Sequence, residues 1–152
     1  MKERTCAVIN PRASRGRAHR VWQGVASQLR DIVGPLDAVF TDGPNAAVHL
    51  AREALHAGAE LVVSVGGDGT LNEVVNGFFH EGTALNPAAQ LGVLMVGTGG
   101  DFRKSIGLPA DTPGQLARLA AGTHRMLDVG RVTLGPPGAG QQVRYFDNIC
   151  SF

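Results

Sequence analysis

The sequence predicts an α/β fold of three layers, in which helices cover both faces of a mostly parallel sheet. Short apolar runs rich in β-branched residues alternate with segments whose apolar residues recur at helical spacing. The connections between these segments are short, which indicates right-handed strand–helix–strand units with parallel neighbouring strands. A chain of 152 residues is long enough for one such domain with a hydrophobic core.

The first predicted strand covers residues 5–9 and ends at Asn10-Pro11, where proline stops the strand. After a loop, the apolar positions of residues 17–33 fit one face of an amphipathic helix. Trp22 lies on that face. We therefore expect Trp22 to pack in the core rather than to bind a ligand.

A second strand is predicted over residues 36–40. The segment Thr41-Asp42-Gly43-Pro44 then signals the start of a helix that reaches about His56. The apolar stripe of this helix is made of small residues, so the helix can lie close against the sheet. The stripe consists of Ala46, Ala47, Leu50, Ala51, Ala54 and Leu55.

A glycine loop from Gly66 to Thr70 follows the third predicted strand, residues 61–65, and opens a helix from Gly69 to about His80. We expect its glycines to take positive φ and to let main-chain N–H groups close on a ligand. With Thr70 as a cap and the positive end of the helix beside it, the loop suits a phosphate group. The simpler alternative is that the glycines only turn a strand into a helix. The glycines are Gly66, Gly67 and Gly69.

Asp68 within this loop argues against a simple turn. An anion site that contains a carboxylate implies a cation between the two negative groups, most simply Mg²⁺. A fourth strand, residues 91–96, ends in a second glycine loop, residues 97–102, which carries Asp101. The carboxyl ends of parallel strands meet at one edge of a sheet, so the two loops should converge there. Neither loop fits a P-loop or the dinucleotide fingerprint.

The last part of the chain has a different pattern. A short amphipathic helix is predicted over residues 112–121, and apolar residues alternate with polar ones from Arg125 onward. A glycine- and proline-rich turn interrupts this alternation. We therefore expect residues 126–134 and 143–152 to form a β-hairpin.

This change of pattern divides the chain into an α/β domain, residues 1–125, and a β-hairpin, residues 126–152. The sequence stops at Phe152 inside a predicted strand, so we expect a truncated fragment. Its hairpin should present an unpaired edge and exposed apolar residues. Such an edge favours a homodimer.

Charge and composition limit the possible partners. A formal charge of +1 and 18% charged residues argue against a protein that binds nucleic acid through bulk charge. Twelve of the fourteen basic residues are arginines, and Arg12 and Arg15 fall in the loop after the first strand. They can either reach a nucleotide phosphate or form a solvated surface loop.

The cysteines and histidines do not form a metal or redox motif. Cys6 and Cys150 have no C-x-x-C spacing, so we expect buried free thiols in a reducing compartment. The sequence has no apolar run long enough for a membrane span and no signal-peptide core. The expected location is therefore cytoplasmic, with peripheral attachment to a membrane as an option.

Several blocks of the sequence resemble the catalytic family of diacylglycerol kinases, sphingosine kinases and bacterial lipid kinases. The most specific block is Gly-Gly-Asp-Gly-Thr at residues 66–70, followed by Asn72-Glu73. Further blocks match at Val8 to Pro11, Ser14 to Gly16, Thr41, Gly97 to Phe102, Asp128 to Arg131, and Phe146 with Asn148. The resemblance implies an ATP-binding α/β domain of the kind shared with NAD kinases. It also implies that the hairpin of residues 126–152 leads into a C-terminal β-rich domain that is missing from this sequence.

The resemblance also implies roles for single residues. Asp68 and Asp101 would belong to a network that holds Mg²⁺ and phosphate. The expected contacts with ATP are Asn10, Thr41, Gly66, Gly67, Asp68, Gly69, Thr70, Leu71, Asn72 and Thr98. The implied activity is transfer of the γ-phosphate of ATP to the hydroxyl of a diacylglycerol-like lipid at a membrane surface.

Two departures from the family pattern qualify this expectation. Gly100 stands where the family commonly has Asn, and the general base of the family is a carboxylate that would lie beyond Phe152. No catalytic residue is therefore assigned in this chain, and the fragment alone is expected to be inactive. Two alternatives stay open: a regulatory nucleotide-binding module without catalysis, and an NAD kinase-like enzyme in which Asp68 acts on the acceptor.

Overall fold

The centre of the molecule is a parallel sheet of four strands in the order β2-β1-β3-β6. The structure, a computed structural model, describes residues 4–97, 100–136 and 140–147. The predicted α/β fold is confirmed, since all three strand pairs of this sheet are parallel. Its strands are β1 (Thr5–Ile9), β2 (Leu36–Phe40), β3 (Leu61–Gly66) and β6 (Gln90–Met95).

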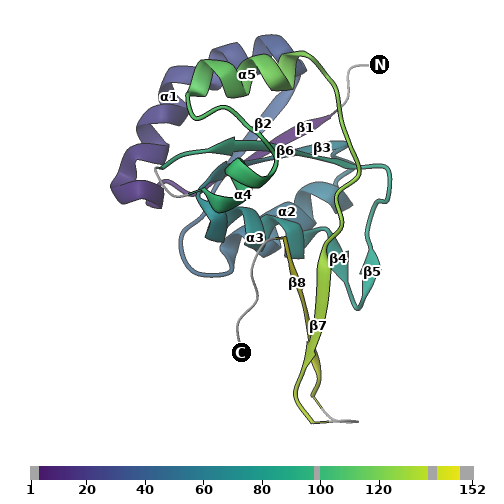
Figure 1. Ribbon diagram of the computed structural model, residues 1–152. Helices are drawn as coiled ribbons and strands as arrows, with labels where there is room; N and C mark the ends of the chain where they lie inside the picture. The colour runs from purple at the N-terminus through teal and green to yellow at the C-terminus, as the bar shows by residue number, and fades with distance from the viewer. Residues whose placement is uncertain (1–3, 98–99, 137–139, 148–152) are drawn as a thin grey trace.

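Helices cover both faces of this sheet, as Figure 1 shows. On one face lie α1 (Ala13–Val33) and α5 (Thr112–Ala120), and on the other lie α2 (Ala46–His56) and α3 (Asp68–Gly77). A short helix, α4 (Asp101–Ser105), follows β6. These helices bury the sheet on both sides, which explains why the central strands are almost continuously apolar.

Side chains that alternate along β1 divide the core into two parts. Ala7 and Ile9 pack on the α1 side, where Trp22 is buried as predicted. Cys6 and Val8 pack on the other side, against the small residues of α2 such as Ala51. The predicted close approach of α2 to the sheet is therefore confirmed.

Two antiparallel hairpins lie outside the sheet. The hairpin of β7 (Gly130–Leu134) and β8 (Gln142–Phe146) extends away from α2 and α3 in Figure 1. It confirms the predicted hairpin, although both strands are shorter than expected and residues 148–152 lie outside the described part of the chain. The second hairpin, β4 (Phe79–His80) with β5 (Thr83–Ala84), is not predicted, because two-residue strands have no periodicity to detect.

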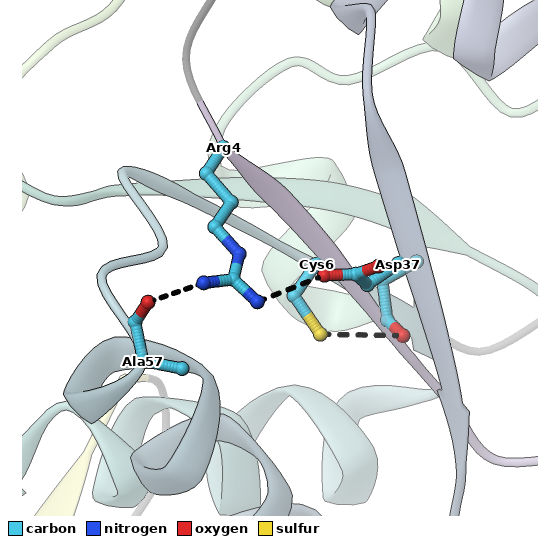
Figure 2. Close-up of polar contacts among 5 residues, drawn as sticks. Arg4, Cys6, Asp37 and Ala57 are labelled. Atoms are coloured by element: carbon cyan, nitrogen blue, oxygen red, sulfur yellow. Dashed lines mark hydrogen bonds and ion pairs between the residues drawn. The ribbon is translucent and has the colours of Figure 1, made fainter.

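Arg4 joins three elements at the amino edge of the sheet (Figure 2). Its guanidinium donates to the carbonyl oxygen of Ala57 after α2 at 2.6 Å and forms an ion pair with Asp37 of β2 at 3.5 Å. Beside it, the Cys6 thiol is buried and free, as expected from the sequence. Burial, with a smaller contribution from the Asp37 carboxylate and an opposing one from Arg4, raises the pKa of Cys6 from 9.0 to about 11. Cys150 lies outside the described residues.

In the described part of the chain, no helix combines the length and apolar character needed to cross a bilayer.

Candidate functional site

A pocket of about 250 Å³ lies at the carboxyl edge of the sheet. Its walls come from the loop after β1, the turn between β3 and α3, and the segment after β6. The two glycine loops thus meet at one edge, as predicted. The lining residues are Ser14, Gly67, Asp68, Met95, Val96, Gly97 and Gly100.

Asp68, the first residue of α3, joins the two glycine loops. One carboxylate oxygen, Oδ2, accepts the main-chain N–H of Gly100 at 3.2 Å. The other oxygen, Oδ1, is buried and has no hydrogen-bond partner among the described residues. A buried carboxylate oxygen without a partner is costly, so a ligand that brings a cation or a donor would stabilise it. This geometry fits the predicted Mg²⁺ role of Asp68.

Asp101 has a different environment. Its side chain is 68% exposed and its carboxylate lies 3.4 Å from the ammonium group of Lys104. Over the described ranges, no group of three or more His, Cys, Asp or Glu side chains is arranged to hold a metal. A Mg²⁺ ion at this edge would therefore bind through Asp68, phosphate oxygens and water, which is its usual manner of binding beside nucleotides. The role of Asp101 stays a prediction.

The glycines of the first loop do not have the positive φ that we expected. Gly66 is instead required by packing, since a Cβ there would lie 2.5 Å from the hydroxyl oxygen of Thr70. A Cβ at Gly67 or Gly69 would meet no atom of the described residues within 4 Å. At these two positions neither the backbone conformation nor packing against the described residues requires glycine. The open space they leave fits the close approach of a ligand.

Thr70 does not cap α3, contrary to our expectation. The cap position is Gly67, and Thr70 is buried within the helix. Its hydroxyl accepts a hydrogen bond from the Asn10 side-chain amide at 3.1 Å, which ties the end of β1 to the glycine loop. Leu71 packs in the core at 1% exposure, and its N–H donates to the carbonyl oxygen of Gly67 at 3.0 Å.

Two further residues expected to contact ATP, Thr41 and Asn72, are not among the residues that line the pocket. Thr41 is buried after β2, with its N–H bonded to the carbonyl oxygen of Ile9 at 2.9 Å. The side-chain amide of Asn72 donates to the carbonyl oxygen of Tyr145 at 3.2 Å and to the Asp147 carboxylate at 3.1 Å, so it holds β8 against α3. Thr98 lies outside the described residues.

Comparison with known proteins decides the family. Residues 4–132 match the model of the diacylglycerol kinase catalytic domain. This chain belongs to that family. The fold agrees, since a crystal structure of a diacylglycerol kinase from Bacillus anthracis superposes with a TM-score of 0.70 over 84% of this chain and 42% of that one, at 23% identity.

Similar curated proteins carry kinase names. A "Diacylglycerol kinase" of Staphylococcus epidermidis is 29% identical over 151 residues, which cover 99% of this chain and 44% of the relative. A "Probable lipid kinase YegS-like" of Chromohalobacter salexigens is 34% identical over 154 residues, which cover 94% of this chain and 46% of the relative. The chain therefore spans about half the length of the curated relatives it matches.

Glu73 has a role that the sequence did not reveal. It lies three positions after the Gly-Gly-Asp-Gly-Thr block of residues 66–70. Its two carboxylate oxygens accept the main-chain N–H groups of Asn45 at 3.0 Å and Ala47 at 3.2 Å. The predicted start signal at residues 41–44 does not cap the helix, because α2 begins at Ala46 and its cap residue makes no side-chain bond. Glu73 on the neighbouring helix supplies the missing acceptors.

Ser14 is the second residue that sequence reasoning missed. Its hydroxyl donates to the carbonyl oxygen of Val96 at 2.7 Å, which anchors the loop after β1 on the end of β6. Ser14, Arg15 and Gly16 have φ of 53°, 58° and 83°. Left-handed backbone at non-glycine residues is strained and concentrates at functional sites. Arg12 and Arg15 are exposed and do not line the pocket, so their contact with phosphate stays a prediction.

Proposed function

We propose that this chain is the ATP-binding domain of a lipid kinase that transfers the γ-phosphate of ATP to the hydroxyl of a diacylglycerol-like lipid. Membership of the diacylglycerol kinase catalytic family supports the kinase class. The observation that carries the nucleotide assignment is the buried Oδ1 of Asp68, which has no partner among the described residues, beside Gly67 and Gly69, where an added Cβ would meet no described atom within 4 Å. Such a site fits a ligand that combines phosphate with a cation.

The start of α3 supplies donors for the phosphate groups. The first N–H groups of a helix have no partner within the helix, and here Leu71 donates the bond nearest the start, to the carbonyl oxygen of Gly67. The N–H groups of Asp68, Gly69 and Thr70 therefore lie in the first turn of α3 without an acceptor within the helix. The helix adds partial positive charge at the same place. These groups would bind and orient the phosphate chain of ATP.

Asp68 would hold the Mg²⁺ ion that accompanies ATP, and such an ion neutralises charge on the phosphate oxygens during transfer. The bond from Gly100 fixes the Asp68 carboxylate, so Oδ1 stays at the same position relative to the glycine loop. Asn10 also helps to position the glycine loop. By holding the Thr70 hydroxyl, it keeps the end of β1 in register with the start of α3.

The lipid acceptor and the general base belong, in this proposal, to the part of the relatives that this chain does not match. The chain covers 44% to 46% of those proteins. We accordingly expect the 152-residue polypeptide to bind nucleotide without kinase turnover. The family match favours a lipid kinase over the NAD kinase-like alternative.

Calorimetric titration of the purified chain with ATP, AMP and NAD, each with and without Mg²⁺, tests this function. We expect ATP to bind more tightly than AMP, with a gain on adding Mg²⁺, because the donors and Asp68 act on the outer phosphates. Preference for NAD over ATP would support the NAD kinase-like alternative. Absence of binding by all three would contradict the nucleotide assignment.

A further inference from the structure

We propose that a second pocket of this chain binds an oxyanion of the phosphate type. The pocket has a volume of about 350 Å³ and lies between α2, the end of α3, the β4–β5 hairpin and β8. It shares no lining residue with the glycine-loop pocket. Figure 1 shows the two hairpins on the same side of the molecule, beyond the layer of α2 and α3.

Positive charge gathers around this second pocket. Arg52 of α2 and Arg144 of β8 line it, and Glu81 is the one acidic side chain among the described residues of the lining. Arg131 reaches the same place, because a Cβ at Gly82 would lie 3.4 Å from its guanidinium. In the described part of the chain, the ion pairs are Arg4 with Asp37 and Lys104 with Asp101, so none of these three arginines is neutralised by a carboxylate.

A hydrogen bond fixes the Arg52 guanidinium, and its Nε donor is buried without an acceptor among the described residues. Its Nη2 donates to the carbonyl oxygen of Phe79 at 3.0 Å, which fixes the guanidinium against the β4–β5 hairpin. Its Nε is buried and has no acceptor among the described residues. A buried donor without an acceptor destabilises the ligand-free protein. A ligand that brings acceptor oxygens would therefore accept a hydrogen bond from this Nε–H group.

Tyr145 provides a second unused group. It is 8% exposed, and its hydroxyl is buried without a hydrogen-bond partner in the described structure. Asn76 fixes its main chain through both an accepted bond at 2.9 Å and a donated bond at 2.8 Å. The ring stacks on Phe79 with centroids 3.9 Å apart. The hydroxyl is thus held rigidly in a residue that lines the pocket.

These features determine the chemical class of the ligand. Two fixed donors and an excess of arginine charge favour an anion rich in acceptor oxygens, which describes phosphate and its monoesters. Val48, Val143 and the stacked rings of Phe79 and Tyr145 form apolar parts of the wall. The pocket can therefore take either a free phosphate compound or the phosphate headgroup of a lipid.

Titration with inorganic phosphate tests the proposal, with calorimetry for affinity and NMR signals of arginine Nε–H groups for location. Because the glycine-loop pocket can also take phosphate, the titration is repeated with saturating Mg-ATP. We expect saturable binding that persists under Mg-ATP. Tyr145→Phe and Arg52→Gln should each weaken it roughly tenfold, the effect of losing one hydrogen bond to a charged ligand. The exposed Arg20→Gln on α1 is the matched control and should bind as the original chain does.

Tyr145→Phe separates a binding role from a structural one. Removing an unpartnered buried hydroxyl should leave the melting temperature of the ligand-free protein unchanged or raise it, while phosphate affinity falls. Should Arg52→Gln fail to fold, Arg52→Lys keeps the charge but loses the Nε donor and is expected to weaken binding as well. Absence of saturable phosphate binding, or equal affinity in the Tyr145 and Arg52 variants and the original chain, would overturn the proposal.

Co-sedimentation with vesicles separates the two sources of the phosphate group. Vesicles of phosphatidylcholine with and without phosphatidate are compared, using the original chain and Tyr145→Phe. Sedimentation that requires both phosphatidate and Tyr145 would assign a lipid headgroup to the pocket. Phosphate binding in solution without such sedimentation would assign a free phosphate compound.

Discussion

Glu73 of α3 accepts the main-chain N–H of Asn45 at 3.0 Å, and this bond connects the helix that follows the glycine loop to the start of α2. Asn45 has a left-handed backbone with φ of 61°, a strained conformation that is retained where surrounding contacts impose it. A second bond, donated by the main-chain N–H of Ala47 to the Glu73 carboxylate, completes the cap. The position of the Thr41 to Asn45 segment therefore depends on Glu73, which follows the Gly-Gly-Asp-Gly-Thr block.

The first prediction concerns this cap. Glu73→Gln keeps the shape of the side chain but removes one acceptor and the negative charge at the positive end of α2. We expect a loss of about 0.5–2 kcal/mol in the free energy of unfolding, measured by urea denaturation. The matched control is Glu53→Gln on the exposed side of α2. Equal stability of both variants would show that Glu73 does not act as a cap.

The second prediction separates the glycines of the first loop by their roles. Gly66→Ala should destabilise the fold by about 1–3 kcal/mol, because the new Cβ would overlap with Thr70. Gly67→Ala and Gly69→Ala should retain the melting temperature, since in the described part of the chain no atom lies within 4 Å of the added Cβ, and should weaken ATP binding. Thermal unfolding and calorimetric titration of the three variants measure both effects. Unchanged ATP affinity at Gly67 and Gly69 would favour a simple turn.

The sheet could be predicted closely from the sequence, and the reason lies in particular residues. Strands Thr5–Ile9 and Leu36–Phe40 have the expected bounds, because each is a short, mostly apolar run with a proline close to one end, Pro11 after the first and Pro35 before the second. The convergence of the glycine loops followed from the parallel topology alone. These features are local in sequence or follow from general rules of chain connection.

Long-range side-chain bonds were not predictable in the same way. The side-chain amide of Asn10 donates to the Thr70 hydroxyl, 60 positions away in the sequence. The side-chain amide of Asn72 donates to the Asp147 carboxylate, 75 positions away. Nothing in the local pattern distinguishes an asparagine that binds a nucleotide from one that holds a distant strand. The strained turn at Ser14 is a similar case, since its anchor at Val96 lies 82 positions away.

The third prediction uses the pKa of Cys6. The folded thiol stays protonated up to a pKa of about 11, while the unfolded thiol ionises near 9.0. Stability linked to Cys6 should therefore be fully present below pH 9 and be lost as the pH rises toward 11, by about 1–2 kcal/mol. Urea denaturation at several pH values, in a Cys150→Ser background, measures this loss. Cys6→Ala should show a smaller decline over the same interval, and an equal decline would contradict the linkage.

The fourth prediction concerns self-association. Met126 is 95% exposed, Leu127 is 43% exposed and Leu134 is 41% exposed, so apolar side chains gather before and along β7. We expect the purified chain to form dimers, detected by sedimentation equilibrium. The double variant Met126→Lys and Leu127→Lys should be monomeric at the same concentration. If the original chain is monomeric, the hairpin is not a dimer interface.

Asp68 carries the central claim, and a calorimetric titration with ATP tests it most directly. The original chain, Asp68→Asn and the exposed control Asp31→Asn are compared in Mg²⁺ and in chelator, after circular dichroism has confirmed that each variant is folded. We expect Mg²⁺ to raise the ATP affinity of the original chain and the control, and this gain to be lost in Asp68→Asn, a difference of roughly tenfold. Removing the charge of an unpartnered buried oxygen should not lower the melting temperature. The same Mg-ATP titration for Asp68→Asn and the original chain would contradict a metal role for Asp68.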